Sequence, residues 1–209
     1  MDKFTEATIA TYNRTAEQYA KNVAGLHHSE VAGTFLEYLP ENTRILDLGC
    51  GSGRDARIFS ERGYEVIGID LSAKLLEIAQ KEAPFVSFEV MDMRKLRFDN
   101  EFFGGVWSVA SMLHLPKLDI PQCLDECNRI LKTNGVIYVG VKLGKGEEFK
   151  PDIRYAEDAF KFYSYFEAGE MDDFIKKAGF TILDSNTKQC FKDYLRQDEI
   201  RVLAKKEKK

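Results

Sequence analysis

The sequence predicts an α/β fold: a doubly wound, mostly parallel sheet with helices on both faces and an antiparallel hairpin at one edge. Three observations predict it. Short apolar runs of strand length alternate with segments that carry helical spacing and capping residues. A glycine-rich turn follows the first of these runs directly. After the last helical segment, two strand-like runs follow each other with no helix between them, which is typical of an antiparallel pair.

The length and composition of the chain fit one globular domain. Its 209 residues are enough to bury a sizeable core, and 44% of them are hydrophobic. No internal repeat or low-complexity linker divides the sequence, apart from a lysine-rich end at residues 205–209. We therefore expect a single domain over residues 1–209.

The charge balance and the apolar runs argue against several classes of protein. Lys and Arg total 30 and Asp and Glu total 34, a net charge of -4, so charge gives no reason to expect a nucleic-acid partner. The apolar runs are far shorter than the ~20 residues of a membrane span, and residues 1–10 lack the apolar stretch of a secretory signal. We expect a cytoplasmic protein with no membrane partner, and the sequence leaves the oligomeric state open.

Four cysteines are too few and too scattered for a disulfide framework. Cys123 and Cys127 stand one helical turn apart, but no second ligand pair follows them. Their apolar neighbours favour a buried helix instead. We expect no metal site.

The first elements lead to the glycine-rich turn. Residues 4–24 have loosely helical spacing, and residues 29–38 form a second expected helix, with Ser29 as its N-cap and Pro40 beyond its end. Residues 44–48 are the first expected strand.

The next elements keep the alternation of strand and helix. A helix over residues 54–62 ends at Gly63, and residues 64–69 form the second strand. Ser72 is the expected N-cap of the following helix, which Pro84 ends.

The remaining elements complete the sheet. The expected strands are 86–90, 103–109, 136–143, 180–186 and 200–205, and the expected helices are 122–131 and 171–178. The last two strands form the predicted edge hairpin.

The turn at residues 49–53 carries the strongest functional signal. Alternate glycines permit unusual backbone angles and let a ligand approach the main chain, and the N–H groups of the next helix favour an anionic group. Residues 51–56 also satisfy the G-x-G-x-x-G/A pattern of dinucleotide-binding proteins, with Asp70 near the expected distance for a ribose acid. This fragment alone leaves a dehydrogenase open.

The larger pattern resembles the class I S-adenosylmethionine-dependent methyltransferases. Residues 45–53 (ILDLGCGSG) resemble the family's first motif, and residues 68–72 (GIDLS) its second. Residues 90–93 (VMDM) resemble the third motif, residues 105–115 (GVWSVASMLHL) the fourth-strand region, and residues 129–136 (RILKTNGV) the turn before strand five. The resemblance implies a Rossmann-like fold and S-adenosylmethionine as the cofactor, with S-adenosylhomocysteine as its product.

The motifs keep their order over residues 12–184, and the resemblance divides the domain by role. It implies an N-terminal helical lid (1–40) and a cofactor-binding core (41–143). An acceptor-side insertion (144–170) follows, and then a C-terminal helix with edge strands (171–209).

The resemblance also assigns cofactor-binding residues. The backbone at Gly49, Gly51 and Gly53 would cradle the methionine end of the cofactor. Asp70 would accept both ribose hydroxyls, and Asp92 the exocyclic amino group of adenine. The full expected set is Tyr19, Asp47, Gly49, Cys50, Gly51, Gly53, Arg54, Asp70, Leu71, Asp92 and Met93.

Each acid also has an ordinary structural interpretation. Asp47 would brace the loop or hold the amino group through water, or it is a turn residue. Asp70 could be a helix-entry acid and Asp92 a surface charge. Leu71 would lie against the adenine, and the Met93 N–H would face a ring nitrogen. Because the three acids follow successive strands, whose carboxyl ends meet at one sheet edge, we favour the cofactor site.

Candidates on the acceptor side rest on fewer signals. Methyl transfer is a direct displacement, so a general base is needed only where the acceptor must lose a proton. His114 follows the fourth strand and is the candidate base, or it only packs there. Tyr12 and Tyr19, seven positions apart, would share one helix face. The resemblance implies that this helix closes over the methionine end of the cofactor, or the helix only docks on the core with its hydroxyls facing water. The expected substrate-binding residues are Tyr12, His114, Tyr163 and Tyr165, although rings in the insertion could also only seal the core.

The sequence therefore predicts methyl transfer to a small molecule, because the chain is compact and has no appended recognition domain. Methylation of RNA or protein, an NAD-dependent oxidoreductase and a non-catalytic cofactor sensor are the alternatives. The acceptor itself is not indicated.

Overall fold

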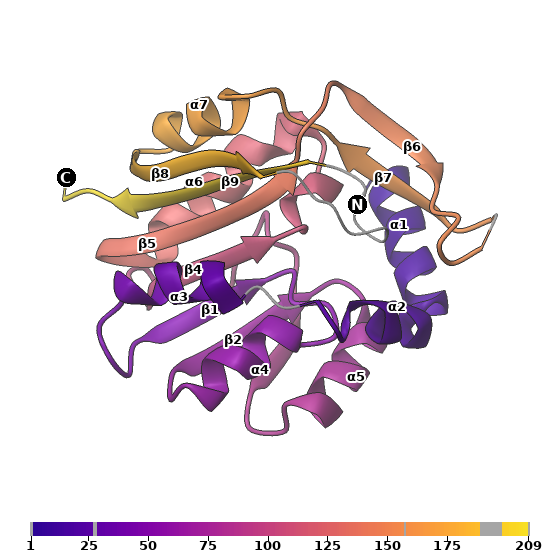
Figure 1. Ribbon diagram of the computed structural model, residues 1–209, viewed down its shortest axis with the longest axis horizontal. Helices are drawn as coiled ribbons and strands as arrows, with labels where there is room; N and C mark the ends of the chain where they lie inside the picture. Colours follow the sequence, from indigo (N-terminus) through magenta and orange to yellow (C-terminus); the bar gives the residue numbers. More distant parts are fainter. Residues whose placement is uncertain (1, 27–28, 157, 189–197, 209) are drawn as a thin grey trace.

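A seven-stranded sheet organises the computed structural model of the chain (Figure 1). The structure describes residues 2–26, 29–156, 158–188 and 198–208. The strand order is β3-β2-β1-β4-β5-β9-β8, in which the first five strands run parallel. The strand β9 lies antiparallel to both β5 and β8. The predicted mostly parallel sheet with an antiparallel edge hairpin is confirmed.

The elements follow the predicted alternation. The strands of the sheet are β1 (Arg44–Leu48), β2 (Glu65–Asp70), β3 (Ser87–Val90), β4 (Phe103–Val109), β5 (Leu131–Lys142), β8 (Phe180–Lys188) and β9 (Glu199–Lys206). The helices are α1 (Lys3–Arg14), α2 (Ala16–Val23), α3 (Ser29–Glu37), α4 (Arg54–Glu61), α5 (Ala73–Glu82), α6 (Ile120–Ile130) and α7 (Glu170–Lys177), with short 3-10 turns η1 (Met112–His114) and η2 (Lys117–Asp119).

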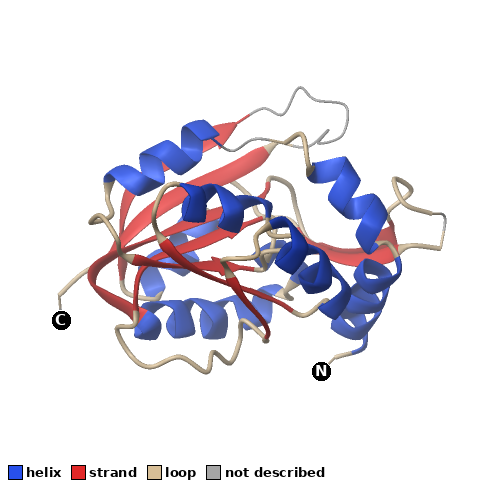
Figure 2. Cartoon of the chain, turned by 90° about the horizontal axis from the view of Figure 1, so that it is seen from below, coloured by secondary structure: helices blue, strands red, loops and turns tan. Residues whose placement is uncertain are grey.

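Helices cover both faces of the sheet, as Figure 2 shows from below. On one face, α3 and α4 bury Phe35 and Phe59 against Trp107 of β4, with ring centroids 5.2–5.7 Å apart. On the other face, α6 and α7 pack against a larger cluster that includes Cys123 and Cys127, both fully buried. The cysteine pair therefore belongs to the core, and Cys190 lies outside the described residues.

Local chemistry explains where several elements begin. The N–H of Leu75 donates to Oγ of Ser72 at 3.2 Å, so Ser72 caps α5 as predicted. Asp2 caps α1 by accepting from the N–H groups of Phe4 and Thr5. The strand β1 is buried over most of its length, which is typical of a central parallel strand.

The predicted opening helix is wrong in one respect, because it is two helices. The chain bends at Thr15, between α1 and α2. Oγ1 of Thr15 donates to the carbonyl of Thr11 at 2.8 Å, and such back-bonding by a Thr side chain often bends a helix.

The insertion at residues 144–170 contains a hairpin that the sequence did not predict. The strands β6 (Glu147–Pro151) and β7 (Phe160–Ser164) pair antiparallel, outside the main sheet. Lys161 in β7 is fully buried. Because lysine is rarely buried in a core, its place in the sequence did not indicate a buried strand. In addition, β5 begins at Leu131, five residues before the predicted start.

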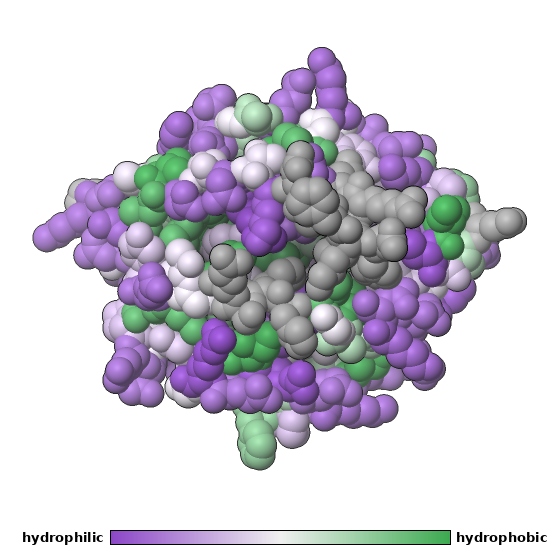
Figure 3. Space-filling view, viewed as in Figure 1, coloured by the Kyte–Doolittle hydropathy of each residue, from purple (hydrophilic) through white to green (hydrophobic). Residues whose placement is uncertain are grey.

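The described part of the chain has no helix with the length and hydrophobicity needed to cross a bilayer. Hydrophilic residues cover much of the face shown in Figure 3, with smaller apolar areas between them.

Candidate functional site

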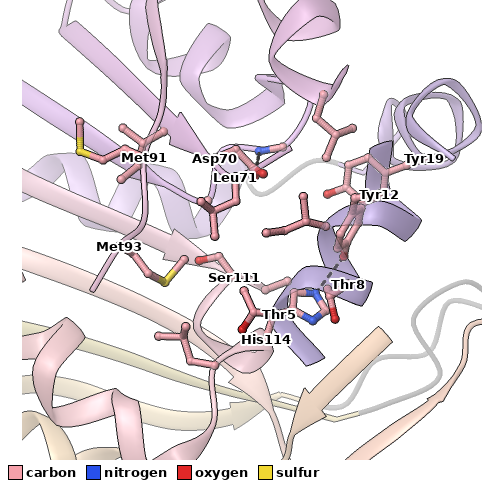
Figure 4. A pocket seen from close by; sticks show the side chains of 17 residues that line it. Thr5, Thr8, Tyr12, Tyr19, Asp70, Leu71, Met91, Met93, Ser111 and His114 are labelled. Carbon is pink, nitrogen blue, oxygen red and sulfur yellow. Dashed lines mark hydrogen bonds between the residues drawn. The ribbon is translucent and has the colours of Figure 1, made fainter. Parts of the chain in front are cut away.

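A hollow opens at the carboxyl ends of β1, β2 and β4, beneath α1 and α2 (Figure 4). Its volume is about 710 Å³, a figure that includes space open to solvent. It is lined by Thr5, Thr8, Ile9, Tyr12, Tyr19, Gly49, Gly51, Ile69, Asp70, Leu71, Leu75, Met91, Met93, Ala110, Ser111, His114 and Leu115. Open α/β sheets bind their ligands at this edge.

The glycine turn forms the floor of the hollow and depends on having no side chains. Gly49 and Gly51 have φ values of 77° and 55°, in the left-handed region. A Cβ on Gly49 would collide with the side chain of Ser111, and one on Gly51 would lie 3.1 Å from Oη of Tyr19. The N–H groups of Gly49 and Cys50 both donate to the carbonyl of Ile69, at 2.8 and 2.9 Å. The turn is thereby tied to the end of β2.

Asp70 connects the turn to the next helix. Its Oδ2 accepts from the N–H of Gly51 at 3.0 Å, and its Oδ1 from the N–H of Ser72 at 2.8 Å. Burial raises the pKa of Asp70, against the opposing effect of these N–H groups. Each carboxylate oxygen keeps further acceptor capacity toward the hollow, which suits a ligand with two neighbouring hydroxyls.

Further acids lie behind the turn. Asp47 is 3% exposed, and its Oδ2 has no hydrogen-bond partner among the described residues. Burial and the nearby Asp55 raise the pKa of Asp47 well above its ordinary value. Arg54 binds Asp55 through two hydrogen bonds of 2.8 and 2.9 Å. Asp47 and Asp55 thus lie near one guanidinium, so two carboxyl groups accompany one cation, and this setting favours a cationic ligand group.

The opposite wall is apolar. Leu71, Met91 and Met93 line it (Figure 4). Asp92 is not among the lining residues, and its carboxylate binds Nε and Nη2 of Arg94 at 3.0 and 2.7 Å. Burial acts to raise the pKa of Asp92, but the Arg94 hydrogen bonds outweigh it and lower the pKa.

The structure brings part of the predicted cofactor set together. The members that line the hollow are Tyr19, Gly49, Gly51, Asp70, Leu71 and Met93. The members that do not line it are Asp47, Cys50, Gly53, Arg54 and Asp92. Gly53 precedes α4, and a Cβ there would lie 2.9 Å from Cβ of Ala79, so this glycine allows close packing of α4 on α5. The binding roles of both groups stay predictions.

The helix α1 lies across the hollow and is held on two sides. Oδ1 of Asn13 accepts from Oγ of Ser72 at 2.8 Å, beside the start of α5. On the other side, Oγ1 of Thr8 accepts from the N–H of Phe162, and Oγ1 of Thr11 donates to the carbonyl of Phe160 in β7.

The prediction that Tyr12 and Tyr19 share one helix face is wrong. They lie on α1 and α2, and the bend between these helices brings their rings together edge-on, with centroids 5.3 Å apart. Both rings line the hollow (Figure 4).

His114 lines the hollow from η1 and is held by two hydrogen bonds. Its Nδ1 lies 2.7 Å from the carbonyl of Phe162, which can only accept, so Nδ1 carries the proton in the neutral ring. Its Nε2 lies 2.8 Å from Oη of Tyr12 and therefore accepts from that hydroxyl. Burial lowers the pKa of His114 to about 3, so the ring is neutral near pH 7.

The two predicted tyrosines of the insertion do not line the hollow. Tyr163 is 3% exposed, and its ring centroid lies 5.1 Å from that of His114. Its hydroxyl donates to Oδ2 of Asp152 at 3.0 Å. Tyr165 is also buried, and its hydroxyl has no hydrogen-bond partner in the described part of the chain. Their substrate-binding roles stay predictions.

Next to Tyr163 lies a charged cluster, in which Asp152 and Lys161 are buried, that the sequence did not predict. Asp152 accepts from Nζ of Lys161 at 3.2 Å and from Arg154 at 2.6 and 2.7 Å. Nζ of Lys142, at the end of β5, lies 4.2 Å from the ring centroid of Tyr163. Surface lysines are common in any sequence, so no signal marked these as buried.

Ser111 is a second residue that the sequence did not single out. Its Oγ donates to the carbonyl of Leu48 at 2.6 Å and lies 2.8 Å from Oγ of Ser108. It packs against Gly49 and thereby fixes the turn against the end of β4.

Comparisons with known proteins agree with this arrangement. Residues 45–135 match the family model described as a methyltransferase domain. The chain is 30% identical over 132 residues to the malonyl-[acyl-carrier protein] O-methyltransferase of Salmonella typhimurium, covering 63% of this chain and 52% of that protein. It spans about half the length of this relative and of the putative methyltransferase YqeM of Bacillus subtilis.

Two solved structures share the fold at low sequence identity. The Burkholderia thailandensis 1,6-didemethyltoxoflavin-N1-methyltransferase, with bound 1,6-didemethyltoxoflavin and S-adenosylhomocysteine, has a TM-score of 0.75 at 20% identity. The match covers 98% of this chain and 87% of that one. The [4+2]-cyclase SpnF has a TM-score of 0.74 at 18% identity, covering 95% and 94%.

Proposed function

We propose that this chain, which belongs to the class I S-adenosylmethionine-dependent methyltransferases, transfers the methyl group of S-adenosylmethionine to a small molecule bound beside His114. The observation that carries the proposal is the buried Asp70 carboxylate, which faces the hollow from the end of β2 and is tied to the glycine turn.

The residues of the hollow fit this cofactor. Gly49 and Gly51 provide main chain that a ligand can approach, since a side chain at either position has no room. The acceptor capacity of Asp70 suits the ribose hydroxyls, and Leu71 and Met93 offer an apolar wall for the adenine. The acids behind the turn, including the unpartnered Oδ2 of Asp47, favour a ligand that carries positive charge.

The cofactor supplies a methyl group on a positively charged sulfur, which an acceptor can attack directly. The chain's contribution is alignment and exclusion of water. The α1 helix, held by Asn13 on one side and by Thr8 and Thr11 on the other, covers the hollow and places Tyr12 against Tyr19, whose hydroxyl lies next to Gly51.

His114 takes the acceptor's proton where the acceptor is a hydroxyl or an N–H group that becomes a strong acid as it bonds the methyl carbon, because a ring whose pKa is about 3 accepts only from such an acid. The carbonyl of Phe162 fixes the Nδ1–H tautomer, so the lone pair of Nε2 faces the hydroxyl of Tyr12, whose side chain lines the hollow. The hydroxyl of Tyr12 bonds that lone pair, and it can either yield its place to the acceptor or pass the proton on. Burial raises the pKa of Tyr12 well above its ordinary value, so this hydroxyl remains a proton donor near neutral pH.

A small-molecule acceptor is supported by the size and enclosure of the site. Apolar side chains such as Leu75 and Met91 form much of the lining, and α1 lies across the hollow, which leaves little room for a folded macromolecule. Among the similar proteins, the toxoflavin-precursor enzyme binds a small molecule, whereas the malonyl relative is named for a substrate on a carrier protein.

Calorimetry and a methyl-transfer assay test the proposal together. S-adenosylmethionine and S-adenosylhomocysteine should both bind, and radiolabelled methyl should reach a metabolite from a panel. Binding of a nicotinamide cofactor without either adenosyl ligand would point to the oxidoreductase. Adenosyl binding without transfer to any small molecule, nucleic acid or protein would point to a sensor.

A further inference from the structure

We infer that the methyl acceptor is an uncharged, largely apolar molecule with an oxygen, such as a carbonyl, that accepts a hydrogen bond from the hydroxyl of Thr8. Thr8 is then a specificity-determining residue on the hairpin side of the hollow. This inference rests on the proposed function and names the class of its substrate.

The hydroxyl of Thr8 is buried at the wall of the hollow and has a proton to donate. Thr8 is 5% exposed and lines the hollow. Its Oγ1 accepts from the N–H of Phe162 at 2.9 Å, and within the described part of the chain its own proton has no partner. The neighbouring Thr5 and Thr11 differ, because both donate their hydroxyl protons to oxygen atoms of the protein, at 2.6 and 2.7 Å. A buried donor without a partner is costly, and an oxygen atom of a bound molecule would satisfy it.

Thr8 lies beside the proposed reacting centre, because Phe162 holds both Thr8 and His114. The N–H of Phe162 donates to Thr8, and its carbonyl accepts from Nδ1 of His114. Tyr12 stands one helical turn after Thr8 on the same face of α1, and its hydroxyl bonds Nε2 of His114. Figure 4 shows the side chains of Thr8, Tyr12 and His114 together at one wall of the hollow. A ligand oxygen bonded to Thr8 would therefore place the rest of the molecule next to Tyr12 and His114.

The hollow offers apolar surface for the rest of the acceptor. Ile9 follows Thr8 directly in α1 and lines the hollow, as do Leu115 and Met93. Such side chains stabilise a bound molecule in proportion to the apolar area that they remove from water. They do not compensate a buried charge. An acceptor that fills this part of the hollow should therefore be apolar apart from its few hydrogen-bonding atoms.

The charges of the hollow do not suit an ionic acceptor. Of the described residues that line it, none is a lysine or an arginine, and Asp70 is the one with a carboxyl group. Lys142 and Lys161 are not among them, and their Nζ atoms lie against tyrosine rings, 4.2 and 3.8 Å from the ring centroids. A carboxylate beside Thr8 would receive its hydroxyl and no cation from the lining, which does not offset the loss of hydration. A cationic acceptor would be repelled by the positive sulfur of the methyl donor.

Three probes of similar size test the inference. Acetophenone carries an uncharged carbonyl, ethylbenzene has a similar shape without the oxygen, and benzoate carries a carboxylate. Each is titrated near pH 7 into protein saturated with S-adenosylhomocysteine, and its affinity is measured by NMR. Acetophenone should bind about tenfold more tightly than benzoate, because only benzoate loses the hydration of a charge. Ethylbenzene reports the apolar part of the affinity.

Variants separate the ligand hydrogen bond from the packing of α1. Thr8→Val keeps the shape of the side chain and removes the hydroxyl, so the affinity for acetophenone should fall about fivefold relative to that for ethylbenzene. Thr8→Ser keeps the hydroxyl and should keep the preference for acetophenone. Thr11→Val is the matched control, because Thr11 also makes one hydrogen bond to β7 but does not line the hollow. It should leave the ratio of the two affinities unchanged.

Three results would overturn the inference: no binding of acetophenone, binding of benzoate that is at least as tight, or an unchanged ratio of acetophenone to ethylbenzene affinity in Thr8→Val. If that variant fails to fold, the wild-type protein decides. Bound acetophenone should then show nuclear Overhauser contacts with the methyl group of Thr8, and their absence contradicts the role of this residue. Failure of S-adenosylhomocysteine to bind would instead contradict the proposed function, which separates the two outcomes.

Discussion

The two sides of the hollow are built in different ways. The cofactor side, residues 47–55 with Asp70 and Leu71, is shaped by main chain: positive φ values, a shared carbonyl at Ile69 and N–H groups on one carboxylate. The side toward the hairpin, which we propose as the acceptor side, includes Lys142, Asp152, Arg154, Lys161 and Tyr163 and is shaped by side chains from separate strands and loops. Local backbone geometry thus determines the first side, whereas the second depends on side chains that only the fold brings together.

The largest expected effect tests the backbone side. Gly49→Ala should lower the affinity for S-adenosylhomocysteine about a hundredfold, because left-handed strain of ~1–2 kcal/mol adds to the clash with Ser111. Gly63→Ala is the matched control, since Gly63 has a φ of 87° but no atom within 4 Å of an added Cβ. It should cost stability, measured by urea unfolding, with no change in calorimetric affinity. Equal loss of affinity in both variants would mean that strain, and not the cradle, is responsible.

The second prediction concerns the junction of the two sides. His114→Asn keeps a donor for the carbonyl of Phe162 and removes the Nε2 lone pair. Turnover on a hydroxyl or N–H acceptor should fall about a hundredfold, the lower range for loss of a general base. Steady-state kinetics should show the loss in kcat, with S-adenosylmethionine affinity unchanged. A variant as active as the wild type would leave His114 a packing role only.

A smaller effect is expected at Asp70, the acid that we propose to bind the ribose. The two oxygens of the Asp70 carboxylate accept from the N–H groups of Gly51 and Ser72, and Asp70→Asn leaves only one such oxygen. The affinity for S-adenosylmethionine should therefore fall by ~1–2 kcal/mol, roughly tenfold. Asp92→Asn provides the comparison, because Asp92 binds Arg94 and does not line the hollow. If calorimetry shows that Asp92→Asn binds S-adenosylmethionine more weakly than Asp70→Asn does, Asp92 is the more important acid, which contradicts this prediction.

The smallest effect is a dependence of stability on pH. The pKa of His114 is lowered to about 3 in the folded protein from an ordinary value near 6.5. Between these values the unfolded chain binds a proton that the folded chain does not, so acidification below about pH 6.5 destabilises the protein. Relative to His114→Asn, the wild type should lose on the order of 1 kcal/mol of unfolding free energy between pH 6.5 and 5. Parallel curves for the two proteins in urea titrations would contradict the buried, neutral ring.

Much of the cofactor side could be predicted from the sequence, because its signals are local. The turn at residues 49–53 and the acid at the end of β2 stand in one short segment of chain, and strand alternation sets which sheet edge they share. The cap at Ser72 was likewise a local signal, and the structure confirms it.

The acceptor side could not be predicted in the same way. Lys161 stands in a strand whose burial depends on pairing with β6 and on contact with α1, and neither is visible in sequence spacing. The hydrogen bond between Tyr12 and His114 joins residues that are 102 positions apart in the sequence. Tyr12 and Tyr19 were predicted to lie together on one helix face. They do lie in contact, but the bend at Thr15 between two helices brings them together.

A crystal structure with S-adenosylhomocysteine tests the central claim most directly. The account predicts ribose hydroxyls within hydrogen-bond distance of the Asp70 carboxylate, the amino acid end along Gly49 and Gly51, and the adenine against Leu71 and Met93. Density for the ligand at any other place, or a ribose turned away from Asp70, would contradict it.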